Sequence, residues 1–110
     1  MKTTINLYNN ANLIATSTVS FNPVDLIKYY FEVMENPFEY DLQIKFEKPF
    51  DMFFEDWTFK VGGYGFESEW SVLEDDQWLY EGKSKEDVLE YLTYSINRIV
   101  EMENERREWA

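Results

Sequence analysis

Apolar and polar residues alternate along much of the chain, the pattern of strands that have one buried and one solvated face. The clearest case is 40–47, where four apolar residues alternate with Asp41, Gln43, Lys45 and Glu47. Similar patterns predict strands over 3–8, 13–21 and 57–61. The stretch 66–80 predicts two more, with a turn at Asp75 and Asp76 that sets Leu73 opposite Trp78.

A different spacing predicts a first helix. Asn22 can cap the free backbone N–H groups, Pro23 suits the first helical position, and Asp25 suits the positive first turn. Apolar residues then recur every three or four positions. We expect this helix to end near Asn36, because Pro37 disfavours helical geometry in the residue before it.

A second helix is predicted after residue 83. Ser84 and Asp87 resemble a capping box, with Asp87 where Glu is usual. An apolar stripe at helical spacing follows, formed by Val88, Leu89, Leu92, Ile96, Ile99 and Val100. The pattern predicts a helix to about Glu103 and a frayed tail over 104–110.

The order of these elements is β-β-α-β-β-β-β-α. Short links between consecutive strands favour an antiparallel sheet, and two one-sided helices can cover one face of it. The sequence therefore predicts a single α+β domain over 1–110, an antiparallel sheet with two helices packed on it. If the helices covered both faces, both sets of strand residues would be buried.

Composition narrows the class of protein. The chain has 110 residues, 45% hydrophobic and 19% aromatic, which is typical of a folded domain. Its net charge of −12 disfavours nucleic acid or an anionic membrane as a direct partner and favours a basic protein or simple solubility. The chain lacks Cys, an apolar span and a signal core, so we expect a cytoplasmic protein.

The residue types also limit the chemistry. The chain has no His and no Cys, so histidine- or cysteine-dependent catalysis and zinc sites made from those residues are excluded. Its glycines match neither phosphate-binding motif. Nothing specific in the sequence supports catalysis by carboxylates alone. Glu74, Asp75 and Asp76 could contact a cation, but a polar turn is the simpler interpretation of these three residues. We expect no enzyme, no cofactor and no metal.

The stretch 66–80 combines five carboxylates and four aromatic residues, and no Lys or Arg lies between Lys60 and Lys83. In the predicted hairpin, Trp70, Val72 and Leu79 share the core face, and Trp78 and Tyr80 lie on the other. Alternate carboxylates on a strand stand roughly 7 Å apart, of the order of neighbouring phosphates in a nucleic-acid strand. The candidate contact residues are Glu67, Glu69, Glu74, Asp75, Asp76, Trp78 and Tyr80.

The second helix offers a further surface. Several residues lie off its apolar stripe, and we interpret them first as a solvated face: Glu90, Tyr91, Tyr94, Glu101 and Glu105.

Small, acidic, aromatic-rich α+β domains without His, Cys or catalytic motifs are typical of phage-encoded inhibitors. The chain resembles anti-CRISPR proteins along its whole length in size, charge and composition. The resemblance implies a non-enzymatic inhibitor of a Cas9-type nuclease that blocks a basic DNA- or RNA-binding surface by acidic mimicry in the cytoplasm of a bacterial host.

Two alternatives stay open. One is a structural, assembly or homodimerisation module of a phage, in which acidity only keeps the protein soluble. The other is an immunity protein that neutralises a toxic nuclease.

Overall fold

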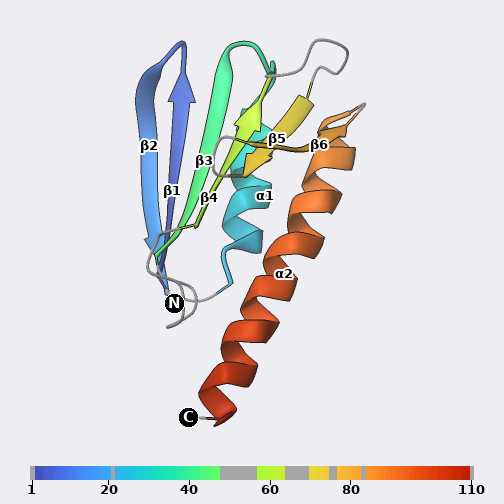
Figure 1. Ribbon diagram of the computed structural model, residues 1–110. Coiled ribbons are helices and arrows are strands. Elements are labelled where there is room, and N and C mark those ends of the chain that lie inside the picture. Colours follow the sequence, from blue (N-terminus) through green and yellow to red (C-terminus); the bar gives the residue numbers. More distant parts are fainter. Residues whose placement is uncertain are drawn as a thin grey trace.

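The computed structural model describes residues 2–20, 22–47, 57–63, 70–74, 77–82 and 84–109, with the backbone alone at 57, 77–79, 81–82, 103 and 106–109. The element order is the expected β-β-α-β-β-β-β-α (Figure 1). The elements are β1 (Lys2–Asn9), β2 (Asn12–Val19), α1 (Val24–Val33), β3 (Tyr40–Glu47), β4 (Trp57–Gly62), β5 (Trp70–Glu74), β6 (Gln77–Gly82) and α2 (Lys85–Trp109).

The strands form one antiparallel sheet in the order β2-β1-β3-β4-β5-β6. β1 and β2 form a hairpin, and α1 then carries the chain across the sheet to β3, which pairs with the other side of β1. The hairpin turn holds Asn10 and Ala11 at φ values of 48° and 67°. Asn tolerates this left-handed conformation well, whereas Ala11 adopts it without that preference.

Both helices pack on the same face of the sheet and run side by side (Figure 1). The core lies between the two layers because β1, β3, β4 and β5 each turn alternate apolar residues toward the helices. It contains Ile5, Leu7, Leu42, Ile44, Phe46, Phe59, Val61, Trp70 and Val72 from the sheet, and Val24, Ile27, Tyr30, Phe31, Val88, Leu92, Ile96 and Ile99 from the helices, with Met34 just after α1. The predicted α+β architecture is confirmed.

The opposite face of the sheet carries polar side chains and no helix among the described residues. Its described positions include Thr4, Asn6, Thr16, Thr18, Gln43, Lys45, Thr58 and Lys60, half-buried or exposed. The arrangement with helices on both faces is therefore excluded for the part of the chain that the structure describes.

The helix boundaries differ from the predicted ones at their C-termini. α1 ends at Val33, three residues before Asn36, and Met34 already has extended backbone geometry. α2 continues to Trp109, so the predicted end near Glu103 is wrong. At about 1.5 Å per residue this helix is roughly 37 Å long, against roughly 27 Å for an eight-residue strand. Its last turns therefore project beyond the sheet (Figure 1).

The helix starts are close to those predicted. The Asn22 side-chain oxygen accepts the Val24 backbone N–H at 3.0 Å, and the Asp87 N–H donates to Ser84 Oγ at 3.2 Å. Pro23 precedes the first helical residue of α1 instead of occupying it.

Candidate functional site

The register of β5 and β6 places one predicted contact residue on an unexpected face. Leu73 pairs with Trp78, as the turn predicts, but a bulge between Val72 and Leu73 sets Tyr80 opposite Val72. Because opposite residues share a face, Tyr80 lies on the helix side and packs against the core. The expectation that Tyr80 lies with Trp78 on the open face is wrong, because one extra residue in β6 reverses the alternation.

Tyr80 is held there by a ring stack. Its ring lies 4.3 Å from that of Tyr91 on α2, with the two planes only 3° apart. Both side chains are half-buried. Tyr94, one turn further along α2, is 65% exposed. We call these three rings the aromatic ridge. Tyr91 and Tyr94 lie beside the apolar stripe of α2, because successive residues of a helix are rotated by about 100° around its axis.

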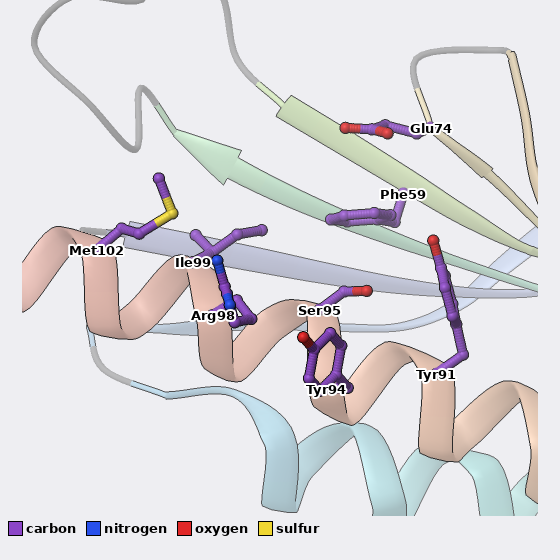
Figure 2. A pocket seen from close by; sticks show the side chains of 8 residues that line it. All are labelled: Phe59, Glu74, Tyr91, Tyr94, Ser95, Arg98, Ile99 and Met102. Carbon is purple, nitrogen blue, oxygen red and sulfur yellow. The ribbon is translucent and has the colours of Figure 1, made fainter.

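A hollow of about 370 Å³ lies on one side of this ridge, between the sheet and α2. Figure 2 shows Glu74 entering it from β5 and the Tyr91 hydroxyl rising toward Phe59. Its lining is Phe59, Glu74, Tyr91, Tyr94, Ser95, Arg98, Ile99 and Met102. It therefore combines apolar walls with one carboxylate and one guanidinium.

A second hollow of about 350 Å³ lies on the other side of the ridge and is lined by Tyr80, Asp87, Glu90, Tyr91 and Tyr94. Its two charged lining residues are both acids. Asp87 is half-buried and Glu90 is exposed. Three aromatic rings and two carboxylates around one hollow suit a cation, which ring faces attract and carboxylates bond.

The Tyr91 hydroxyl holds its proton more tightly than an ordinary tyrosine. Burial raises the pKa of Tyr91 above its ordinary value of 10.0, and the hydrogen bond with Ser95 lowers it. The electrostatic influence of Glu74 and Tyr80 raises that pKa further. At neutral pH this hydroxyl is therefore a neutral hydrogen-bonding group between the two hollows.

We call this set the tyrosine surface: Tyr80, Tyr91 and Tyr94 with Glu74, Asp87 and Glu90. Of the predicted contact residues it contains Glu74 and Tyr80. Glu67, Glu69, Asp75 and Asp76 lie outside the described residues. Trp78 is placed by its backbone alone, opposite Leu73.

The sequence pattern does not reveal that α2 contributes most of the tyrosine surface. Glu90, Tyr91 and Tyr94 lie off the apolar stripe as predicted, but Tyr91 is part of a stack and not of a plain solvated face. The sequence indicates Asp87 only as a capping residue. The available signal was the pair of tyrosines three residues apart, which share one side of a helix.

A third hollow, between the two helices, is a weaker candidate. Its lining pairs two bases, Lys28 and Lys85, with the acids Glu32 and Glu86. Lys85 also donates to the Met34 carbonyl at 2.9 Å, where α1 ends. Its role there is to join the helices.

The described residues contain no group of three or more potential ligands that could hold a metal ion. None of the helices in the described part of the chain has the length and apolar character that crossing a membrane requires. Comparison of the sequence with protein-family models and with curated proteins, and of the fold with solved structures, finds no match.

Proposed function

We propose that the chain is a non-enzymatic inhibitor that binds a nucleic-acid-handling enzyme, and specifically an anti-CRISPR protein that blocks a basic DNA- or RNA-binding surface of a Cas9-type nuclease. The observation that supports this is the tyrosine surface, where the exposed Tyr94 stands between two hollows edged by Glu74, Asp87 and Glu90. Aromatic anchors ringed by polar groups are typical of protein interfaces.

The chemistry of this surface suits arginine and lysine side chains. A guanidinium that enters the second hollow can stack on Tyr91 or Tyr94 and donate charge-assisted hydrogen bonds to the carboxylates of Asp87 or Glu90. Enzymes that hold nucleic acid present such side chains in positively charged channels. A nuclease channel is therefore a fitting partner surface.

The charge of the whole chain adds long-range attraction. A net charge of −12 steers a basic partner and speeds encounter. Along α2, Glu86 and Glu90, and again Glu101 and Glu105, stand four residues apart, about 6 Å along the helix axis. This spacing resembles that of charges along a nucleic-acid strand and supports mimicry.

The other predicted contact residues form a second set in the proposal. Glu67, Glu69, Asp75 and Asp76 are to be tested by charge reversal to Lys, and Trp78 is to be tested by W78A. The site of action in this proposal is the cytoplasm of a bacterial host.

The test measures binding to a Cas9–guide complex and inhibition of its DNA cleavage. D87N/E90Q removes two charges from the tyrosine surface, and Y94A removes the exposed ring. We expect each to weaken binding about tenfold or more, because charge-assisted bonds and stacked anchors are lost.

The matched control is E35Q/E47Q, which removes two exposed acids elsewhere. We expect it to change affinity about twofold at most, through lost steering alone. Equal losses in both double variants would reject a specific surface and leave only bulk charge. Full inhibition by D87N/E90Q and Y94A would reject the tyrosine surface as the contact.

Binding should also weaken steeply as salt rises, because mimicry depends on charge. Salt-resistant binding would favour the assembly module. An immunity protein shares this physics and would be recognised by inhibition of a toxic nuclease and not of Cas9.

A further inference from the structure

Among the described residues, β2 is an open edge of the sheet. β2 pairs with β1 on one side and ends the strand order on the other. Its Leu13 and Ile14 are 54% and 53% exposed, and Thr16 and Thr18 are exposed as well. α1 reaches β2 only from the helix side, where Tyr30 and Ser17 share a hydrogen bond of 2.7 Å between their hydroxyl oxygens.

This edge lacks most of the features that protect such strands from pairing. Natural edges carry Lys, Pro, inward charges or bulges. The β2 sequence, NLIATSTV, has no charged residue and no Pro. Its one irregularity falls where the register shifts between Leu7 and Tyr8, near the hairpin turn. The segment 15–19 pairs regularly with 3–7 and leaves a straight edge.

The charge distribution points to a second copy of the same chain as the partner. All 22 acids follow residue 24, so β2 and its hairpin lie in the acid-free part of the chain. Two molecules that each carry −12 repel least when they approach through this part. A basic partner would find no carboxylate on this strand to bind.

We propose that two copies pair their β2 edges antiparallel about a two-fold axis, which joins the two sheets into one. An axis at Ser17 sets Thr16 of one copy opposite Thr18 of the other, and Ala15 opposite Val19. This register keeps faces matched, because Thr16 and Thr18 lie on the polar face and the other three on the helix face. Opposed threonines are a favourable cross-strand pair, and the interface is self-complementary.

The pairing is independent of the proposed inhibition. β2 and β6 are at opposite ends of the strand order. The tyrosine surface adjoins β5, β6 and α2, so the dimer leaves two such surfaces open.

Sedimentation velocity of the full chain over a range of concentrations tests the proposal. The wild type should form dimers, and T16K/T18K should be monomeric because it opposes like charges at both threonine pairs. T16K/T18E should restore the dimer at low salt, because in this register it opposes unlike charges. The control E101Q/E105Q matches the net charge change of T16K/T18K on exposed α2 residues and should leave the dimer intact.

A wild type that stays monomeric, or equal behaviour of T16K/T18K and T16K/T18E, would overturn the pairing. Amide exchange of the wild type provides a second measurement that needs no variant: protection of residues 15–19 should rise with protein concentration. Protection that appears only when a foreign protein is added would also overturn it and assign the edge to another chain's strand.

Discussion

Two buried hydroxyl groups of the sheet differ in what they contact. Thr3 and Ser71 are both 0% exposed. Ser71 Oγ donates to the Gly62 carbonyl at 2.9 Å, whereas Thr3 Oγ1 has no hydrogen-bond partner among the described residues. A buried hydroxyl without a partner reduces stability, because its hydration is lost without replacement.

We therefore expect T3V to leave the free energy of unfolding unchanged or to raise it by up to about 1 kcal/mol, because the shape is kept and an unsatisfied group is removed. S71A should lower it by about 1 kcal/mol, because a buried hydrogen bond is lost. Urea unfolding measures both. A clear loss of stability in T3V would show that its hydroxyl is bonded.

The raised pKa of Tyr91 makes the free energy of unfolding depend on pH under alkaline conditions. Its pKa in the folded protein is raised, chiefly by burial, above the ordinary 10.0 of the unfolded chain. The folded state thus holds this proton more tightly. The associated stability is fully present below about pH 10 and is lost as the pH rises through the folded pKa.

Comparison with Y91F isolates this effect, because the other tyrosines are common to both proteins. From about pH 9 to about pH 11, the stability of the wild type should fall relative to that of Y91F. In an E74Q background the fall should be smaller, because the Glu74 charge contributes to the raised pKa. A difference that stays flat with pH would contradict the buried, neutral hydroxyl. Denaturant unfolding at each pH gives the free energies.

At the scale of elements, Asn22 holds the start of α1 in two ways. Its side-chain oxygen accepts the Val24 N–H, and its side-chain nitrogen donates to the Asn97 side-chain oxygen of α2 at 2.8 Å. One residue therefore satisfies an open helix N–H and joins two elements that are distant in the sequence.

We expect N22A to lower the free energy of unfolding by about 1 kcal/mol, the usual contribution of such an oxygen near a helix start. N97A removes only the exposed bond between Asn22 and α2 and should cost about half as much or less. Thermal or urea unfolding decides. Equal losses of stability in N22A and N97A would mean that the Asn22–Asn97 bond, and not the bond to Val24, stabilises the start of α1.

The bulge in the β5–β6 hairpin shows how strand register decides which residues belong to the tyrosine surface. The pattern over 66–80 correctly predicts this strand, and the predicted turn correctly gives the Leu73–Trp78 pair. The pattern does not predict the extra residue after Trp78, which moves Tyr80 to the helix side. The position of this extra residue depends on the packing of β6 against α2, where the Tyr80 ring stacks on the ring of Tyr91.

At the scale of the whole molecule, the fold separates the charge. The acid-free hairpin forms one edge of the sheet, and the tyrosine surface lies toward the other. The proposed dimer forms through the acid-free hairpin, and the proposed basic partner binds the tyrosine surface. A dimer through β2 would present two tyrosine surfaces and raise the avidity for a partner with two basic sites, provided that the geometry lets both engage.

The element order, the antiparallel sheet, the approximate helix starts and the buried stripes can be predicted from the sequence alone. These depend on local alternation, capping and turn residues, which act over a few neighbours. The sequence does not predict that Glu74 from β5, Tyr80 from β6 and Tyr91 from α2 share one surface, or that α2 continues beyond the sheet; the three-dimensional arrangement shows both. Strand register and helix packing join residues distant in the chain, and no local pattern records which of them meet.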